Sequence, residues 1–210
     1  IRGGEPLEAA NKINVIVFDK TGTLTKGKPE LKDIIALAGM RPEEILQIAA
    51  SLEKGSEHPL ADAILSHAGK NGIQTQEVQS FRAIPGKGIE GKIVGKTYRL
   101  GNRALLQAAF DHLHSHRQQA IATLESDGKT VMLLANEQEV IGAISVSYTL
   151  KETSKEAVDR LRKMGIEVFM ITGDNARTAK AIALSIGIQN VLAEVLPEQK
   201  AAEVKKLQEQ

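Results

Sequence analysis

Short apolar runs that end in polar loops recur near both ends of the chain. Residues 14–18 are mostly apolar and β-branched, and Asp19 follows them directly. Residues 167–171 repeat this pattern before Thr172, and residues 190–193 form a third short run. Continuous apolar runs of this length are typical of buried parallel strands, whose polar loops lie at the carboxyl edge of the sheet. The pattern therefore predicts a parallel α/β sheet.

Helical periodicity follows two of these runs, and the middle of the chain has a different pattern of apolar residues and glycines. From about residue 31 to 136, helical segments alternate with glycine-rich, strand-like pieces, which indicates a largely antiparallel sheet. We predict an α/β domain of residues 1–30 and 141–210, interrupted by an α+β domain of residues 31–140 whose sheet is flanked by helices. The predicted helices are residues 42–52, 59–68, 175–186 and 197–208, and the predicted strands of the insert are residues 86–95, 96–100 and 130–135.

Composition removes several classes of function. The 210 residues hold 27 Lys plus Arg against 26 Asp plus Glu, so the net charge of +1 creates no global field for nucleic acid or an anionic membrane. The lack of Cys excludes disulfides and thiolate metal sites. We expect no nucleic-acid partner and a monomeric chain.

The two ends of the chain suggest a piece of a longer protein. It starts at Ile1-Arg2-Gly3-Gly4, without Met or the features of a signal or transit peptide, and it stops inside a predicted helix. No apolar stretch approaches the roughly 20 residues that cross a bilayer. We therefore expect a soluble part of a larger protein.

Candidate chemistry lies in the polar loops after the first two predicted strands. In an open parallel sheet, ligands bind beyond the carboxyl ends of the strands, so Asp19 and the loop at Thr172 would face one crevice. A carboxylate can act as a covalent nucleophile towards phosphorus if a cation and fixed donors neutralise the phosphoryl oxygens. Mg²⁺ suits hard oxygen ligands of this kind. The available donors are Thr21, Thr172, the amide of Gly173 and Lys200.

Three motifs resemble those of P-type ATPases, and the likeness covers nearly the whole chain. The first is the seven-residue run Asp-Lys-Thr-Gly-Thr-Leu-Thr that begins at Asp19. The Thr-Gly-Asp-Asn segment from Thr172 is similar to the family's second phosphorylation-domain motif, and the Pro-Glu-Gln-Lys segment from Pro197 to its third. The resemblance implies a catalytic set of Asp19, Thr21, Thr172, Gly173, Asp174 and Lys200, with Asp19 accepting the phosphoryl group of ATP and Lys200 on the phosphate. It also implies Mg²⁺ bound by Asp19 and the carbonyl of Thr21, with a further ligating Asp beyond the chain end.

Thr21, two places after Asp19, separates two enzyme classes. In haloacid-dehalogenase-like phosphatases, which resemble this strand and loop, a second Asp at that position serves as general acid and base. Thr cannot activate water as a carboxylate does, and general acid–base catalysis is typically worth about 10²- to 10⁴-fold. We therefore expect a persistent aspartyl phosphate and a pump cycle, with a soluble phosphatase carrying a cap domain as the rival enzyme.

Motifs inside the predicted insert narrow the resemblance to heavy-metal-transporting P-type ATPases. The segment Ser-Glu-His-Pro-Leu around His58 is similar to the signature of that branch's nucleotide-binding domain. Glycines at such sites let the backbone approach a ligand closely. The resemblance implies that ATP is bound by Glu53, which contacts adenine, by His58, which helps to orient ATP, and by Gly86, Gly88, Gly101 and Asn102.

The whole resemblance implies a haloacid-dehalogenase-like Rossmann phosphorylation domain with an inserted α+β nucleotide-binding domain. It implies ATP and Mg²⁺ as cofactors, a cytoplasmic location within an integral membrane protein, and the pump's actuator and transmembrane domains as partners. Copper export is favoured, and a zinc or cadmium pump is the alternative. A non-enzymatic module that senses nucleotide is a further rival, for which Asp19 would be dispensable.

Two departures from the family pattern predict a catalytically handicapped chain. Tyr148 stands where the family has Asp in a run like Ser-Asp-Thr-Leu-Lys, and this predicts weaker handling of Mg²⁺ or phosphate. The family's Gly-Asp-Gly-x-Asn-Asp segment does not follow the predicted helix of residues 197–208. We therefore expect the chain to bind nucleotide better than it phosphorylates itself.

Several other polar residues are better explained as ordinary surface or packing residues. His112, His114 and His116 form a His-x-His-x-His run, but only the first and last share a helix face, and two ligands do not complete a metal site. His67, Arg177 and Lys180 are interpreted as solvated helix residues. The alternation of side chains turns Lys20 away from Asp19, so we interpret it as a packing or surface residue outside the catalytic set.

Overall fold

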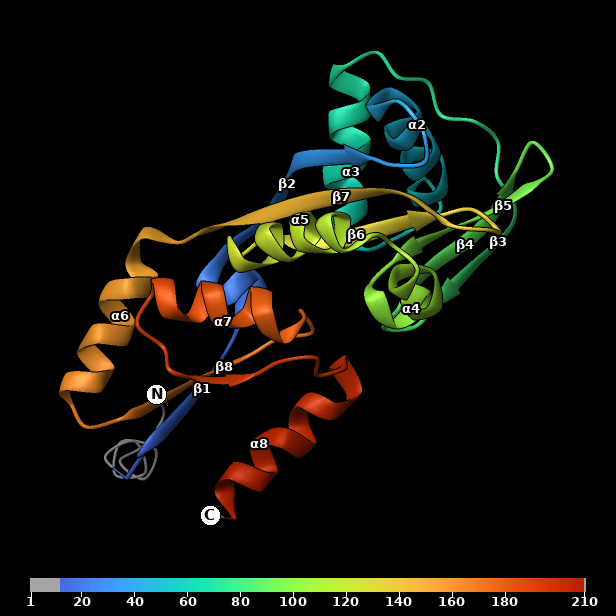
Figure 1. Ribbon diagram of the computed structural model, residues 1–210. Helices are drawn as coiled ribbons and strands as arrows, with labels where there is room; N and C mark the ends of the chain where they lie inside the picture. Colours follow the sequence, from blue (N-terminus) through green and yellow to red (C-terminus); the bar gives the residue numbers. More distant parts are fainter. Residues whose placement is uncertain (1–11, 210) are drawn as a thin grey trace. The chain divides into compact units, whose positions relative to one another are not determined.

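The computed structural model describes residues 12–209, so Ile1-Arg2-Gly3-Gly4 and the rest of the first eleven residues, and Gln210, lie outside it. The chain divides into two compact units, which are described separately. The α/β unit holds the described residues up to Lys26 and those from Leu150 onward, and the inserted unit is Gly27–Thr149. Figure 1 labels their elements.

The α/β unit contains a parallel sheet with the strand order β1-β8-β9. Asp19, the last residue of β1, lies opposite Ile171, the last residue of β8, so two strand ends and their loops meet at one edge. Helices α6 and α7 bury Val158 and Ala179 against Val168 and neighbouring apolar residues. The elements are β1 (Val15–Asp19), the wide turn η1 (Lys20–Leu24), α6 (Glu152–Lys163), β8 (Glu167–Ile171), α7 (Ala176–Ser185), β9 (Asn190–Leu192), η2 (Pro197–Gln199) and α8 (Lys200–Gln208).

The inserted unit contains a six-stranded sheet with the order β2-β7-β6-β5-β4-β3. Neighbouring strands from β7 through to β3 are antiparallel. The elements are β2 (Thr25–Ala36), which begins just before the unit, α2 (Pro42–Glu53), α3 (Pro59–Lys70), β3 (Gln79–Ile84), β4 (Gly88–Ile93), β5 (Lys96–Gly101), α4 (Arg103–Asp111), α5 (Ser115–Ser126), β6 (Thr130–Ala135) and β7 (Val140–Leu150).

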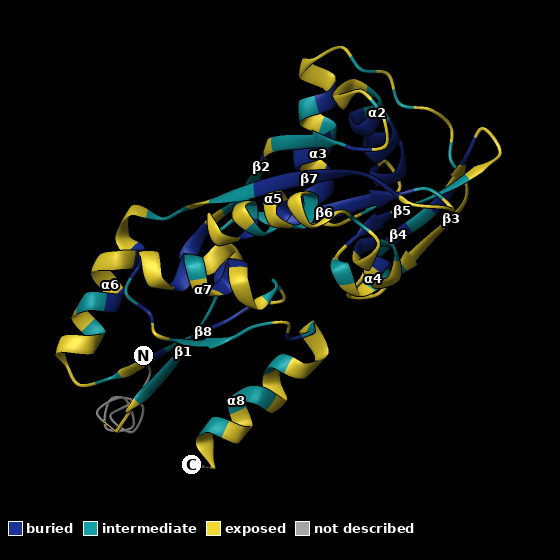
Figure 2. Cartoon of the chain, viewed as in Figure 1, coloured by how far each residue is buried: buried dark blue, intermediate teal, exposed yellow. Residues whose placement is uncertain are grey.

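Both faces of the central strands are buried. Along β6, Met132 and Leu134 belong to the cluster that contains α2 and α3, while Val131 and Leu133 belong to the cluster that contains α4 and α5. Because successive side chains of a strand point to opposite faces, one strand supplies both cores. Figure 2 shows the buried centre of this sheet and the exposed outer faces of its helices.

The predicted fold class is confirmed, and the unit boundaries differ from the predicted ones. The structure divides the chain at 26/27 and 149/150 rather than at 30/31 and 140/141. The second difference arises because the apolar run after residue 140 is part of β7, in which Val140 to Val146 are buried within the six-stranded sheet. Among residues 12–209, no helix is both long and apolar enough to span a membrane.

Candidate functional site

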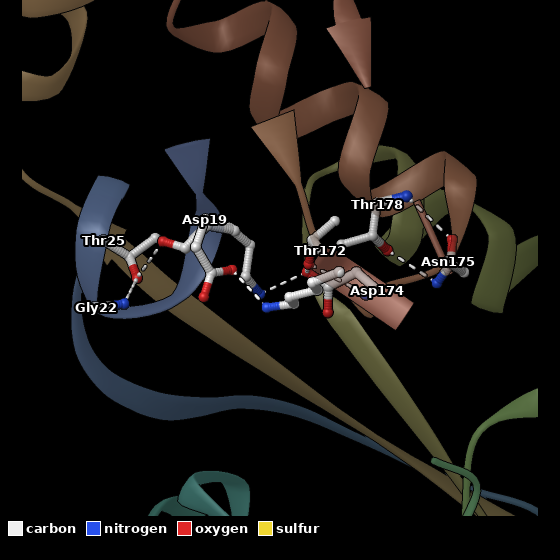
Figure 3. A network of polar contacts seen from close by, with 9 residues as sticks. Asp19, Gly22, Thr25, Thr172, Asp174, Asn175 and Thr178 are labelled. Atoms are coloured by element: carbon white, nitrogen blue, oxygen red, sulfur yellow. Dashed lines mark hydrogen bonds and ion pairs between the residues drawn. The ribbon is translucent and has the colours of Figure 1, made fainter. Parts of the chain in front are cut away.

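Asp19 lies at the carboxyl end of β1, as predicted, and its carboxylate is accessible. Lys200, the first residue of α8, places its ammonium nitrogen 2.9 Å from Oδ1 of Asp19. The Asp19 side chain is 42% exposed, so the carboxylate can still meet a ligand. Figure 3 shows Asp19, Thr172 and Asp174 gathered at the ends of two neighbouring strands. The structure thus brings together the first, second and third motifs.

The turn after Asp19 is held by a buried threonine. The Thr25 hydroxyl donates to the carbonyl of Lys20 at 3.3 Å and accepts the N–H of Gly22 at 3.2 Å. Gly22 has φ +78°, a conformation that favours glycine. Thr21 is exposed on this turn. The Thr-Gly-Thr-Leu-Thr residues therefore shape the loop that presents Asp19.

Two residues beyond the predicted motifs fix the same turn. Lys151 donates from its ammonium group to the carbonyl of Gly22 at 2.8 Å, and its backbone N–H donates to the carbonyl of Leu24. Ser154, which is buried in the first turn of α6, donates its hydroxyl to the same Leu24 carbonyl at 2.8 Å. The sequence offered a signal for Lys151, since it ends the Thr-Leu-Lys segment, but none for Ser154.

The second polar loop is closed by its own side chains. Thr172 is buried, and its hydroxyl donates to Oδ2 of Asp174 and accepts the Asp174 N–H, each at 3.2 Å. Asn175 caps α7 by accepting the N–H groups of Arg177 and Thr178. The hydroxyl proton of Thr172 is thus directed to Asp174 in this structure. The space around Gly173 does not explain why this position is glycine. A methyl group there would lie 3.5 Å from the carbonyl oxygen of Val195, which is an ordinary van der Waals contact.

Lys20 joins the two loops, and its interpretation as a possible surface residue is wrong. Its side chain is 2% exposed, and its ammonium nitrogen lies 2.5 Å from Oδ2 of Asp174, whose side chain is 9% exposed. Removing either member of a buried ion pair would leave the other charge buried without compensation, which costs stability. The contact therefore keeps the Lys20 and Asp174 side chains together. Local alternation of side chains did not indicate this contact, because the partner lies on a different strand end.

The donor set at Asp19 fits Mg²⁺. Hard cations prefer carboxylate and carbonyl oxygens, and the accessible Asp19 carboxylate and the exposed turn at Thr21 offer both. Asp174, by contrast, is occupied by Lys20 and Thr172. Mg²⁺ held there would supply positive charge beside the Asp19 carboxylate, next to the Lys200 ammonium group that contacts the same carboxylate.

Glu53 in the inserted unit is a buried carboxylate that lacks part of its hydrogen bonding. It ends α2 and is 4% exposed. Its Oε2 atom is buried without a hydrogen-bond partner among the described residues. Burial raises the pKa of the Glu53 carboxyl, and a weaker opposing effect comes from a hydrogen bond with Ser56. An unsatisfied buried polar atom is uncommon in folded proteins, and a donor from an ordered water or a ligand would satisfy it.

His58 and Asn102 each begin a helix. His58 caps α3 through its Nδ1, which accepts the N–H of Leu60 at 3.2 Å, and its ring is exposed. Asn102 caps α4 by accepting the N–H of Leu105, and its amide donates to the carbonyl of Gly86 at 2.8 Å. The Asn102 side chain therefore ties the predicted glycine turn to the helix.

The predicted glycines Gly88 and Gly101 are required by the packing of two strands. They lie opposite each other in β4 and β5. A methyl group on Gly88 would come within 2.2 Å of the Leu100 carbonyl oxygen, and one on Gly101 within 2.2 Å of the Lys87 carbonyl oxygen. The close approach of the two backbones thus explains both residues without any ligand.

The other residues considered in the sequence lie outside the Asp19 site and outside the predicted nucleotide site. An open groove of about 460 Å³ lies between the start of β2 and α3, and His67 lines it, but none of the six predicted nucleotide residues does. His114 and His116 stack at 5.9 Å in an exposed segment, and no cluster of potential metal ligands occurs among residues 12–209. Arg177 and Lys180 are exposed, whereas Tyr148 packs against the core of the inserted unit.

The fold and the acidic strand end define a class of protein. Residues 13–210 match the family model of haloacid dehalogenase-like hydrolases, described as hydrolases, and the chain belongs to this family. Its curated relatives are more particular. It is 47% identical over 210 residues to the probable copper-importing P-type ATPase A of Enterococcus hirae, and 44% identical over 209 residues to the copper-exporting P-type ATPase of Bacillus subtilis. These alignments cover 99% and 100% of this chain but only 28% and 26% of the relatives.

Solved structures agree with this similarity. The catalytic domain of the CPx-ATPase CopB-B, studied for conformational changes upon nucleotide binding, matches with a TM-score of 0.73 at 25% identity, covering all of this chain and 72% of that one. A zinc-transporting PIB-type ATPase in its E2.Pi state matches with a TM-score of 0.63 at 35% identity, covering all of this chain and 34% of that one. The chain is therefore similar, over its whole length, to the catalytic part of P-type ATPases.

Proposed function

We propose that this chain is the ATP-binding and phosphorylation part of a heavy-metal-transporting P-type ATPase, and that Asp19 accepts the γ-phosphoryl group. The observation behind the proposal is the accessible Asp19 carboxylate at a strand end, 2.9 Å from the Lys200 ammonium and beside the Thr172 loop. A nucleophile of this kind needs a cation beside it when phosphoryl charge arrives.

In the proposed step, a carboxylate oxygen of Asp19 forms a bond to the γ-phosphorus of ATP. The bond from that phosphorus to the bridging oxygen breaks, and ADP leaves with the electron pair. Lys200 would move from the carboxylate to the phosphoryl oxygens, which carry the charge in the product. Bound Mg²⁺ would supply further neutralisation. Lys151 and Thr25 hold the Asp19 loop in place during the step.

Thr21 sets the fate of the aspartyl phosphate in this proposal. Hydrolysis needs a base that removes a proton from water, and Thr21 offers a hydroxyl where a carboxylate would be required. The intermediate therefore lasts long enough to drive movement elsewhere in the pump. A soluble phosphatase is disfavoured for the same reason, and hydrolysis of small phosphoesters by this chain would favour it instead.

Copper is the proposed ion, because the two curated relatives cited above are named as copper pumps at 44% and 47% identity. We propose export as the direction, as in the Bacillus subtilis relative, although the Enterococcus hirae relative is named as an importer. Zinc is the alternative ion, and the 35% identity to the zinc-transporting structure is the observation that supports it. In the proposed pump this chain lies on the cytoplasmic side, with actuator and transmembrane domains as its partners.

We expect Asp19→Asn to abolish phosphorylation while sparing nucleotide binding. In the complete pump, radiolabelled ATP should give an acid-stable, hydroxylamine-sensitive phosphoenzyme that the variant lacks. Calorimetric titration of the 210-residue chain should give an ATP affinity within about twofold of the wild type, since the predicted nucleotide residues lie in the inserted unit. Asp127→Asn, which alters an exposed carboxylate at the end of α5, serves as the control. A pump that transports ions with Asp19→Asn would contradict the proposal and favour the nucleotide sensor.

A further inference from the structure

Ser154 directs its hydroxyl to a distant part of the chain. It is the third residue of α6, and it is 5% exposed. A serine at or near the start of a helix commonly hydrogen-bonds to backbone groups of its own turn. Ser154 instead donates over 2.8 Å to the carbonyl of Leu24, which lies 130 residues earlier in the chain. The hydroxyl therefore contacts the end of the turn that follows Asp19.

The need of the Leu24 carbonyl for a partner does not explain this hydrogen bond. The carbonyl already accepts the backbone N–H of Lys151 at 3.0 Å, so it would keep a donor without Ser154. A carbonyl oxygen has two lone pairs, and Ser154 supplies a second donor. Alanine would also favour the helix more than serine does. The second hydrogen bond instead restricts the rotation of the peptide group, because two donors fix its direction.

Helix α6 holds residue 24 by its side chain as well as by its backbone. Val158 lies four residues after Ser154, so the two share a face of the helix. Val158 is completely buried, and it belongs to the same hydrophobic cluster as Leu24. One face of α6 thus carries both the hydroxyl that binds the Leu24 carbonyl and an apolar side chain of the core around Leu24. The far end of the turn is anchored to this face.

The near end of the turn carries Asp19. The turn η1 (Lys20–Leu24) lies between Asp19 and the anchored end. Thr25 closes the turn through hydrogen bonds with Lys20 and Gly22 (Figure 3). A displacement of the anchored end therefore moves the closed turn and the nucleophile together. A misplacement of reacting groups by about 1 Å, caused by a distant change, can lower a rate about 10²-fold.

We propose that Ser154 is a positioning residue for the phosphorylation of Asp19, and that its hydroxyl holds the turn where the carboxylate meets the γ-phosphorus in line. The inference rests on the proposed function, because it names a residue that sets the rate of the same step. Ser154 acts indirectly, through the carbonyl of Leu24. A purely structural role is the alternative, and it predicts a loss of stability without a specific loss of rate.

Single-turnover phosphorylation of the complete pump tests the proposal. Ser154→Ala removes the donor and should lower the rate of phosphoenzyme formation about tenfold at saturating ATP. The ATP concentration that gives half of the maximal rate should change less than about twofold, since the predicted nucleotide residues lie in the inserted unit. Ser154→Thr keeps a hydroxyl and should phosphorylate within about threefold of the wild type. Ser154→Cys offers a weaker donor, so its rate should fall between those of Ser154→Ala and the wild type.

Ser185 provides the matched control. It lies in the same α/β unit, at the end of α7, and its hydroxyl also donates to a backbone carbonyl, that of Ile182, at 2.7 Å. Ser185→Ala should leave the phosphorylation rate unchanged. Hydrogen exchange of the 210-residue chain supplies a second readout. Ser154→Ala should speed the exchange of the amides of residues 20–25 and leave those of β8 as protected as in the wild type.

The outcomes separate this inference from the proposed function. If the wild-type pump forms no phosphoenzyme at Asp19, the proposed function fails. If it does so and Ser154→Ala is phosphorylated at the wild-type rate, the inference fails alone. Faster exchange throughout the α/β unit, or a loss of rate in Ser154→Thr equal to that in Ser154→Ala, would show a structural role and also overturn the inference. If Ser154→Ala does not fold, Ser154→Cys decides, and a wild-type rate in that variant contradicts the proposal.

Discussion

Replacing Lys20 with Met should lower the free energy of unfolding of the α/β unit by about 3 kcal/mol, because it leaves the carboxylate of Asp174 buried without its cation. Both side chains are almost fully buried, so water replaces little of the lost interaction. Differential scanning calorimetry should show the loss as a lower melting temperature for one transition. The inserted unit contains neither residue, so its transition should stay in place.

A second lysine in the same unit provides the matched control for this experiment. Lys26 lies 3.6 Å from Glu152, and their side chains are 51% and 90% exposed. Lys26→Met should therefore change stability by less than about 0.5 kcal/mol. The double variant Lys20→Met/Asp174→Asn should lose less than the sum of its single variants, because removing both charges leaves no lone ion. Strictly additive losses would show that the two residues do not act as a pair.

Replacing Glu53 with Gln should stabilise the inserted unit and weaken the binding of ATP. Burial raises the pKa of the Glu53 carboxyl, because folding moves its charged form out of water. The stability contributed by this group is complete below its unfolded pKa and is lost as the pH rises through the raised folded value. Gln does not titrate, so the variant should be more stable than the wild type at pH 7, and this gain should shrink as the pH falls to 4. ATP affinity should fall about tenfold, since the contact with adenine that is proposed for Glu53 would lose a carboxylate acceptor and gain an amide.

Glu125 provides the control for this prediction. It is a glutamate of similar burial in the same unit, but it is paired with Arg103 at 2.9 Å. Glu125→Gln should therefore destabilise the unit and leave ATP affinity unchanged. Thermal unfolding between pH 4 and 8 and calorimetric titration supply both readouts. A loss of stability in Glu53→Gln at neutral pH would mean that its carboxylate is satisfied in the absence of nucleotide.

Local patterns were sufficient for the elements that form the candidate phosphorylation site. The apolar run of residues 167–171 coincides with β8, and the run before Asp19 coincides with most of β1, because buried parallel strands consist of continuous apolar residues. Seven-residue and four-residue motifs then identified both loops. Their meeting at one edge followed from the parallel arrangement of the strands.

Contacts between distant segments could not be predicted in this way. The pairing of Lys20 with Asp174 depends on the register of two strands that are far apart in the chain. Strand β3 lacks an apolar alternation, since it lies at a sheet edge and most of its residues are exposed, and so no pattern indicated it. The need for glycine at Gly88 and Gly101 arises from the approach of two backbones, which only the three-dimensional pairing reveals.

The inserted unit enters through β2 and leaves through β7, and these two strands are neighbours in the same sheet. A segment whose first and last strands lie side by side can be removed or exchanged while the flanking chain spans only a short gap. The inserted unit can therefore be exchanged as a whole between related proteins. Recombination between related genes at codons near 26 and 150 would transfer a complete six-stranded sheet together with both of its hydrophobic cores, and the recipient α/β unit would keep every strand of its own.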